Sequence, residues 1–567
     1  MSDEKKTVGK YSQDSRIDTL LSNIIGELRQ FTEEQAQNLT EMTAIGRALS
    51  AQRDSAVIFE MILKQARRFT NADGGTLYLI HDNQKELIFN VLHNDTLNSY
   101  MGGTSGNPVT LPNVPLIDDD GNPNHSNVSA YVATTGEIVN IPDVYEAEGF
   151  NFEGAKKFDA ALNYRSMSML VVPMRDHENE IIGVLQLINA KERLSKETIP
   201  FLPETVDMTA ALASQAAVVI TQQRLIRELK ILFESFIKAI ATAIDQKSKY
   251  TGGHIERVAE LTMSIANKIN NTNDGLFADV QFSDDELDEL RIAAWMHDTG
   301  KITTPEHVVD KSNKLETVFD RVELVKTRWQ AIRLSRKLEA ERAKIKLLEA
   351  KCSADELKAI EEECNKDISV MDEDIDFLMV TNKGGEFLGD DKVERINNLA
   401  EKQYSENGDK HNYLSENEVY NLSIRKGTLT NEERNKMNDH ATMTIKILDT
   451  LPWPKKLQNV PAIAGAHHEK LDGTGYPNGL KEEDIGLGAR IMAVADIFEA
   501  LSASDRPYKK PMPLSQAIKI LGFMVKDHHI DGDVVDLFVQ SGLCFEYADK
   551  FLKKDQIDMD LNLEKEE

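Results

Sequence analysis

Apolar residues recur at three- and four-residue steps along two stretches of the N-terminal half, a spacing typical of amphipathic helices. One stretch lies within residues 1–37 and carries its apolar positions between Ile17 and Leu28. The other spans residues 205–247 and includes Leu225, Leu229 and Leu232. Each stripe fits a helix packed on its own domain or a helix paired with another one, and the longer second helix favours a homodimer.

Residues 38–204 alternate short strand-like runs with helical ones. Runs rich in β-branched and aromatic residues at 76–80, 86–91 and 169–174 predict strands, and a polar turn at 176–180 leads into a fourth strand at 181–189. Because this last pair is joined by a tight turn, the sheet is expected to be antiparallel. This stretch is therefore predicted to be an α+β domain.

A long, highly charged helical run extends from residue 318 to about residue 379, within a segment that reaches residue 425. Its apolar positions suit an antiparallel helical hairpin: Val322, Val325, Trp329, Ile332, Leu338, Ile345, Leu347 and Leu348. A solvated face is the simplest explanation of the charges, and a docking surface or a lid over a site are the alternatives. Residues 546–567 form an acidic tail without visible chemistry.

At 567 residues the chain is too long for one hydrophobic core, so about three or four folding units are expected. The chain has 41% hydrophobic and 28% charged residues and no apolar run near the roughly 20 residues of a membrane span, which predicts a soluble protein without membrane contact. Its start lacks an apolar signal segment, which favours the cytoplasm. The cysteines lie outside any metal-type spacing, so disulfides are not expected: Cys352, Cys364 and Cys544.

The net charge of −28 argues against a binder of DNA or RNA polymers, because phosphate backbones are held by an excess of Lys and Arg. A small anionic substrate fits this charge only where side-chain cations or metal ions gather locally. The stretch 464–477 offers such a place: His467 and His468 are adjacent, carboxylates follow, and a Gly-rich turn ends at Tyr476-Pro477.

Further residues with metal-binding side chains precede and follow this stretch. His254 comes after two glycines at a helix start, and His440 precedes the histidine pair. His297 and Asp298 are adjacent, and a carboxylate has two oxygens with which it can bridge two metal ions. Asp496 lies in an apolar helix, where an unpaired carboxylate would be costly to bury. Each residue alone has an ordinary structural explanation, but their joint occurrence predicts a metal centre.

Together these motifs resemble the HD-GYP family of metal-dependent phosphodiesterases. The resemblance covers residues 235–545 apart from the insertion and rests on His297-Asp298, Gly300-Lys301, His467-His468-Glu469, Gly475-Tyr476-Pro477 and Asp505-Arg506-Pro507-Tyr508. It implies an all-helical domain over residues 248–545, a centre of two or three divalent ions, commonly iron or manganese, and cyclic di-GMP as substrate. It assigns metal ligation to His254, His297, Asp298, His440, His467, His468 and Asp496.

The resemblance also implies how the substrate is held and cut. A metal-activated water would attack phosphorus in line while the metals and Lys301 stabilise the developing charge, so Lys301 and Asp298 are the expected catalytic residues. Further substrate contacts would come from Tyr476, Pro477, Arg506, Lys509 and Lys510.

One departure from the family affects the number of metals. Some members have a Glu four residues before the first histidine, which binds a third metal, whereas this chain has Tyr250 there. Two metals and the linear product pGpG are therefore expected, rather than complete conversion to GMP. The alternatives are a non-catalytic cyclic-dinucleotide receptor, a general nucleotide phosphohydrolase, and hydrolysis of cyclic GMP-AMP.

Residues 38–204 resemble a GAF domain of the cyclic-nucleotide-binding branch. The resemblance rests on Thr135-Gly136-Glu137, on residues 140–145 and 164–166, and on the strand that ends at Asn189. It implies cyclic AMP or cyclic GMP as ligand, with Thr135, Asp143 and Tyr145 as pocket candidates. Asn189, Lys191 and Phe201 stand at shifted spacing from the family motif, and Glu204 stands without the motif's Asp-Glu pair, so a different ligand or a purely structural role stays open. Because the helix at 205–247 ends shortly before His254, a ligand that shifts this helix would move a metal ligand.

Overall fold

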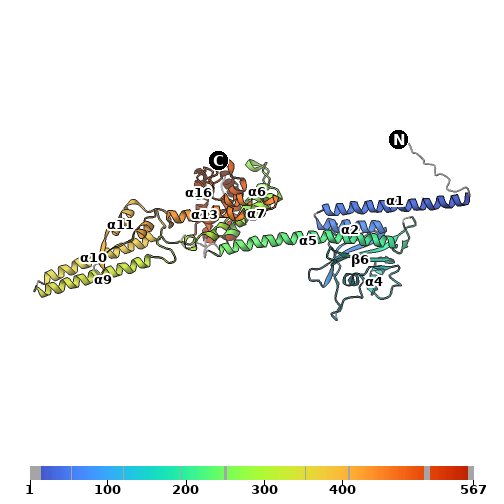
Figure 1. Ribbon diagram of the computed structural model, residues 1–567, viewed down its shortest axis with the longest axis horizontal. Coiled ribbons are helices and arrows are strands. Elements are labelled where there is room, and N and C mark those ends of the chain that lie inside the picture. Colours follow the sequence, from blue (N-terminus) through green and yellow to red (C-terminus); the bar gives the residue numbers. More distant parts are fainter. Residues whose placement is uncertain are drawn as a thin grey trace. The chain divides into compact units, whose positions relative to one another are not determined.

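The structure is a computed structural model that describes residues 15–52, 54–118, 120–192, 194–247, 252–351, 353–406, 409–503 and 511–559. The chain divides into two compact units, Met1–Leu232 and Phe233–Glu567 (Figure 1). Across the described ranges, no helix combines the length and the apolar character needed to cross a membrane.

The first unit is built on an antiparallel sheet with the strand order β3-β2-β1-β7-β6-β5, in which β4 pairs with β2 and β8 pairs with β7. The four strands predicted from the sequence are confirmed as β1, β2, β6 and β7. The strands are β1 (Ala72–Ile80), β2 (Glu86–Asn94), β3 (Ser99–Gly102), β4 (Val114–Pro115), β5 (Val139–Ile141), β6 (Met169–Arg175), β7 (Ile181–Lys191) and β8 (Thr198–Ile199).

Helices cover both faces of this sheet, which explains why the central strand β1 is buried along most of its length. On one face, α2 (Ser55–Thr70), the end of α1 (Ser15–Ala51) and the start of α5 (Pro203–Asp245) pack on Leu77 and Leu187. On the other face, α3 (Val128–Thr135) packs on Tyr78 and Val184, and α4 (Glu153–Leu162) follows later in the chain. The predicted α+β class of this unit is confirmed.

Helix α5 agrees closely with the helix predicted at 205–247. Its first part packs on the sheet through Leu212 and Ala216, which are buried. Further along, Leu225, Leu229 and Phe236 are exposed by 43%, 63% and 61%. The apolar stripe of α5 therefore continues beyond the part that its own domain covers.

Within its described ranges the second unit is helical, as predicted, except for one small two-stranded hairpin that was not predicted. Its main core joins α6, α7 and α15 to α16, α17 and α18 near the C-terminal end. The helices outside the insertion are α6 (His254–Asn270), η1 (Gly275–Phe277), α7 (Asp284–Met296), η2 (Thr299–Thr303), α8 (Glu306–Val309), α13 (Asn431–Leu448), η3 (Lys455–Leu457), α14 (Val460–Gly465), η4 (Glu482–Asp484), α15 (Leu487–Ser502), α16 (Leu514–Lys526), α17 (Gly532–Gln540), α18 (Leu543–Phe551) and η5 (Lys554–Gln556).

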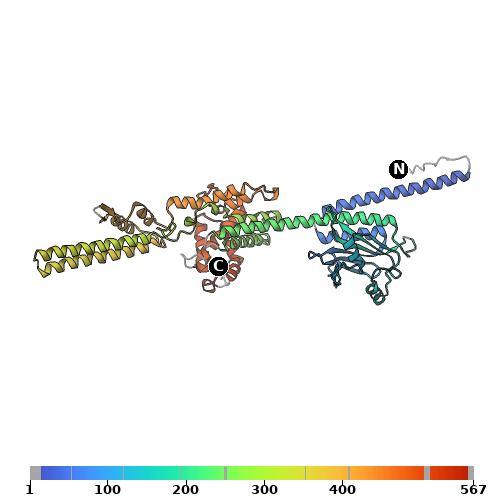
Figure 2. The ribbon, with the colours of Figure 1, turned by 60° about the horizontal axis from the view of Figure 1, so that its bottom comes forward.

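The predicted helical hairpin is confirmed as α9 (Val322–Glu349) and α10 (Ala354–Asn382), which lie side by side in both views of the ribbon (Figures 1 and 2). It shares a core with α11 (Asp390–Glu401) and α12 (Glu416–Leu422). A polar two-stranded hairpin, β9 (Gln403–Glu406) and β10 (Asp409–Asn412), was not foreseen because its strands lack apolar alternation.

One part of the hairpin prediction is wrong. Val322, Val325, Trp329 and Ile332 are buried as expected, but Leu338, Ile345 and Leu348 are exposed by 51%, 54% and 60%. These side chains lie on a face of α9 that α10 does not cover. Residues three or four positions apart share a face of a helix, and these three residues are out of step with the buried face of Val325, Trp329 and Ile332.

Candidate metal centre

The seven predicted metal ligands come together in the second unit, mostly at the ends of helices. His254 is the first residue of α6, His297 follows the last residue of α7, and Asp298 precedes η2. His440 lies within α13 and Asp496 within α15, while His467 and His468 follow α14. Six of them are buried, and His468 is half-buried.

Three histidines share one local hydrogen-bonding pattern. The Nδ1 atom of His297 lies 2.8 Å from the carbonyl of Ala294, and that of His467 lies 2.7 Å from the carbonyl of Ala464. The Nδ1 atom of His440 lies 2.5 Å from the carbonyl three residues earlier. A carbonyl can only accept, so each Nδ1 carries the proton and each Nε2 keeps its lone pair.

These three Nε2 atoms are buried and have no hydrogen-bond partner among the described residues. A buried nitrogen lone pair without a donor is unfavourable unless a cation occupies the site. The donor set therefore fits a metal, because neutral imidazole and carboxylate oxygen are common ligands of divalent transition metals.

Asp298 lies at the centre of the arrangement. Its Oδ2 atom is 3.5 Å from Nε2 of His254 and 3.4 Å from Nε2 of His297, and its Oδ1 atom is 3.5 Å from Nε2 of His440. The Oδ1 atom of Asp496 lies 3.3 Å from the same Nε2 atom of His254. The two oxygens of Asp298 thus face two different sets of histidines.

Two groups of possible ligand atoms result, each within 4.8 Å: His254, His297 and Asp298 in one, and His440, His467 and His468 in the other. Asp298 connects them, since its Oδ1 atom faces His440 of the second group. This geometry fits two metal positions with a bridging carboxylate.

Burial and neighbouring charges keep Asp298, His467 and His468 in forms suited to metals. Burial alone would raise the pKa of Asp298, but Lys301 and His297 outweigh it and hold this pKa well below its usual range. Burial lowers the pKa of His467 well below its usual value and that of His468 to about 4. The carboxylate is therefore ionised and both of these imidazoles are neutral at pH 7.

Sequence reasoning missed Glu499, which orients His254. Its carboxylate is fully buried and accepts a hydrogen bond from Nδ1 of His254 at 2.5 Å. Its other oxygen accepts from Arg257 at 2.7 Å and 2.8 Å. A carboxylate behind a ligating histidine fixes the tautomer and raises the ligand's basicity. The available signal was its position one helical turn after Asp496 in an apolar helix.

Thr444 and Gly300 hold the His297–Asp298 corner against α13. The Thr444 hydroxyl donates to the carbonyl of His297 at 2.9 Å and accepts from the amide of Gly300 at 2.9 Å. A Cβ atom on Gly300 would lie 1.9 Å from the carbonyl oxygen of His440. Only glycine allows these two backbone segments, and hence their ligands, to approach this closely.

Lys301 and the Gly-Tyr-Pro corner form the edge of the site. The Lys301 ammonium lies 2.5 Å from Oδ2 of Asp298 and its side chain is 24% exposed. The Tyr476 ring lies 4.8 Å from the ring of His468 and is followed by a cis bond to Pro477. Glu469 accepts the backbone amides of Asn478 and Leu480 and so holds this corner instead of a metal.

Some predicted residues lie outside the described ranges. They are Tyr250, Arg506, Lys509 and Lys510.

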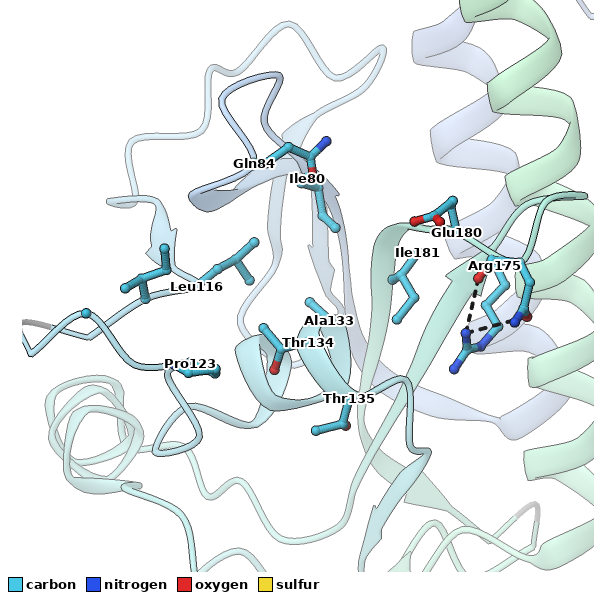
Figure 3. A pocket seen from close by; sticks show the side chains of 13 residues that line it. Ile80, Gln84, Leu116, Pro123, Ala133, Thr134, Thr135, Arg175, Glu180 and Ile181 are labelled. Carbon is cyan, nitrogen blue, oxygen red and sulfur yellow. Dashed lines mark hydrogen bonds between the residues drawn. The ribbon is translucent and has the colours of Figure 1, made fainter.

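The first unit contains a separate cavity of about 520 Å³ (Figure 3). The β1–β2 turn with Gln84, the end of α3 with Thr134 and Thr135, and the β6–β7 hairpin form its walls. The Arg175 guanidinium is held at this wall by hydrogen bonds to the carbonyls of Gly136, at 3.0 Å, and Asn179, at 3.2 Å.

Of the three pocket candidates in this unit, Thr135 lines the cavity and the other two lie elsewhere. Asp143 accepts a hydrogen bond from Arg165 at 2.9 Å. The Tyr145 hydroxyl is 3.1 Å from Asp159, and the Arg165 guanidinium lies 5.0 Å above the Tyr145 ring. Asp143 and Tyr145 therefore belong to a cluster of ion pairs and ring contacts.

Family models match three segments of the chain. A GAF domain matches residues 54–220, and two HD domain models match residues 251–372 and 417–534. A GAF domain crystal structure from an Acinetobacter phosphoenolpyruvate-protein phosphotransferase is 16% identical, covers 33% of this chain and 95% of its own, and has a TM-score of 0.23.

Curated relatives match within limited segments. The 3′3′-cGAMP-specific phosphodiesterase 3 of Vibrio cholerae is 47% identical over 17% of this chain and 20% of the relative. A cyclic di-GMP phosphodiesterase of Thermotoga maritima is 46% identical over 17% of this chain and 26% of the relative. A probable cyclic di-GMP phosphodiesterase of Vibrio cholerae is 38% identical over 23% and 31%. The chain thus aligns with a fifth to a third of the length of these relatives. It combines an N-terminal GAF domain with a C-terminal HD domain that carries the motifs of the HD-GYP family.

Proposed function

We propose that the chain hydrolyses a phosphodiester bond of a cyclic dinucleotide, cyclic di-GMP in the first place, with two divalent metal ions. The observation that carries this proposal is the pair of buried ligand groups connected by Asp298, together with three buried Nε2 atoms that have no partner within the described ranges. The proposed ligands are His254, His297, Asp298, His440, His467, His468 and Asp496.

Bound metal ions would supply Lewis-acid polarisation of a phosphate and a nucleophile of lowered pKa. Asp298 holds the two ligand groups together, and Glu499 and the backbone carbonyls orient the imidazoles. Lys301, at the partly exposed edge, would stabilise the negative charge that develops as the bond to the leaving oxygen breaks. The histidine and carboxylate set suits iron or manganese.

Tyr476 and Pro477 are proposed to shape the mouth of the site, and Arg506 with Lys509 or Lys510 to hold a phosphate. Cyclic GMP-AMP is the second candidate substrate, because one of the relatives with high identity is specific for it. Since a tyrosine stands at position 250, where some HD-GYP proteins have a glutamate, we propose pGpG as the main product.

The test combines metal analysis with product identification. In the purified full-length chain, His297→Ala and Asp298→Ala should lower the metal content and abolish hydrolysis of both dinucleotides, because His297 belongs to one ligand group and Asp298 connects the two groups. Full activity in either variant would contradict the assignment. A wild-type chain that binds a dinucleotide without cutting it would favour the receptor alternative, and rapid formation of GMP would contradict the two-metal proposal.

We also propose that the GAF domain regulates this site through α5. The last residue of α5, Asp245, accepts the backbone amides of Gly253 and Ile255, at 3.1 Å and 3.4 Å, on either side of His254. Two residues later, the Lys247 ammonium donates to the carbonyls of Lys301 at 2.9 Å and of Ile302 at 2.5 Å. The end of α5 is thus tied to both a metal ligand and the charge-stabilising lysine.

A ligand that favours one position of α5 would change turnover. The coupling free energy between two such sites is typically about 1–3 kcal/mol. Cyclic AMP or cyclic GMP is the proposed ligand, from the GAF resemblance. The exposed apolar positions of α5 support a homodimer in which this helix is the seam. Calorimetry with each cyclic mononucleotide, followed by turnover assays with and without it, tests the coupling. No binding, or binding with unchanged activity, would leave the domain a structural unit.

A further inference from the structure

The short helix η2 carries Lys301 three residues after Asp298. At the start of η2 the amide of Gly300 donates to the hydroxyl of Thr444 at 2.9 Å. Further along, apolar packing contributes little, because Ile302 is 59% exposed. The position of Lys301 therefore depends on the hydrogen bonds that hold the backbone of η2.

The Lys247 ammonium holds the other end of this backbone. It lies 2.9 Å from the carbonyl oxygen of Lys301, 2.5 Å from that of Ile302 and 2.6 Å from that of Thr304. An ammonium has three N–H donors and no acceptor. Its three donors thus match three carbonyls of one short segment, and one of these carbonyls belongs to Lys301 itself.

A cation suits this place better than a neutral side chain does. The last carbonyls of a helix lack partners inside it, and a positive charge nearby stabilises them. Hydrogen bonds from a charged donor are roughly twice as strong as those from a neutral one. Thr304 is buried, so water has little access to its carbonyl as a substitute donor. Loss of the Lys247 ammonium should therefore loosen the end of η2.

We propose that Lys247 is a positioning residue for Lys301, an inference that rests on the hydrolysis proposed above. Its ammonium fixes the backbone from Lys301 to Thr304. The Lys301 side chain then stays 2.5 Å from Oδ2 of Asp298, where it meets the charge that develops in the reaction. The role of Lys247 is indirect, since these three hydrogen bonds all go to backbone carbonyls.

The main alternative is that Lys247 acts on the metal ligands. Asp245 lies two residues earlier and accepts the backbone amides on either side of His254. A change at Lys247 that acted along this route would loosen His254 and lower the metal content. The metal content of a Lys247 variant therefore separates the two routes.

A double-mutant cycle in the full-length, metal-loaded chain tests the proposal. The variants are Lys247→Met, Lys301→Ala and the two combined, with kcat and KM measured for cyclic di-GMP. Methionine keeps most of the side-chain length and removes the charge and the donors. Lys238→Met is the matched control, because it makes the same change on the same helix, at an exposed position over the ring of Trp295.

We expect Lys247→Met to keep its metal, to keep KM within about threefold, and to lose roughly ten- to hundredfold in kcat. A misplaced charge-stabilising group weakens the transition state and not the bound substrate. The loss cannot exceed that of Lys301→Ala, through which it acts. In the Lys301→Ala background the same change should therefore add less than about a twofold loss, and Lys238→Met should stay within about twofold of the wild type.

Four results would each overturn the proposal. They are an equal loss from Lys247→Met in both backgrounds, a loss of metal in this variant, a loss of kcat larger than that of Lys301→Ala, and an unchanged kcat.

Hydrogen exchange of the peptide spanning residues 299–304 adds a readout that does not require activity. We expect faster exchange in Lys247→Met and unchanged exchange in Lys238→Met, and unchanged exchange in both would overturn the proposal. Faster exchange in Lys247→Met, in a protein whose wild type hydrolyses no cyclic dinucleotide, would confirm the hold on η2. It would contradict the proposed function and, with it, the role of Lys247 in hydrolysis.

Discussion

The substitution Glu499→Gln removes one negative charge behind His254 and leaves the side chain almost unchanged in size. In the structure one oxygen accepts from Nδ1 of His254 and the other from Arg257. A glutamine amide offers one acceptor and one donor. If its oxygen faces His254, its NH2 group faces Arg257, which can only donate. If it is flipped, the NH2 group faces Nδ1 of His254, favours the other tautomer, and places a proton on the Nε2 atom that should bind metal.

The magnitude follows from this mismatch. One unpaired buried donor costs about 1–3 kcal/mol, and tenfold in an equilibrium constant corresponds to about 1.4 kcal/mol. Metal affinity should therefore fall about ten- to hundredfold, the range found for residues that orient metal-bound histidines. The assay is metal titration of apoprotein by calorimetry, with hydrolysis of cyclic di-GMP measured on the same samples at saturating metal.

Glu469→Gln is the matched control. Glu469 is also buried, but its oxygens accept backbone amides of the Gly-Tyr-Pro corner and not a histidine. Its substitution should leave metal affinity within about threefold of the wild type, since it touches no ligand directly. An unchanged metal affinity in Glu499→Gln, or an equal loss in both variants, would refute the reasoning about His254.

Three further outcomes are expected. Lys301→Ala should keep its metal but lose about a hundredfold in turnover, the effect of removing one charge-stabilising donor, and loss of metal in this variant would show a structural role instead. Gly300→Ala should lower metal content, because its Cβ would collide with the carbonyl of His440, and a metal content equal to wild type would contradict the close approach. Burial lowers the pKa of Lys314, whose ammonium donates to the carbonyl of Leu422, from 10.5 to about 8. The unfolded chain therefore binds more protons above pH 8, and the free energy of unfolding of the region around Lys314 should rise with pH up to about pH 10.5. Lys314→Met should remove that slope in urea titrations followed by hydrogen exchange, and a slope that persists would assign it to another group.

Local patterns in the sequence were sufficient to predict which of these segments form strands and which form helices. Strand-like runs at 76–80 and 181–189 and the helical spacing at 205–247 depend on the periodicity of neighbouring residues, which the backbone imposes without distant contacts. The same holds for His297-Asp298 and His467-His468, where adjacent ligands and a Gly-rich turn carry the chemistry in one short segment. The resemblance of these motifs then predicted which distant residues belong together.

Tertiary structure alone decided how those residues face one another. Asp298 has one oxygen for each group of histidines because η2 and α13 meet at Gly300, a contact between residues far apart in the chain. That Glu499 is the partner of His254 follows only from the packing of α15 against α6. On α9 the pattern predicted apolar positions correctly but not their direction, because periodicity places residues on a face and only packing shows whether another element covers it.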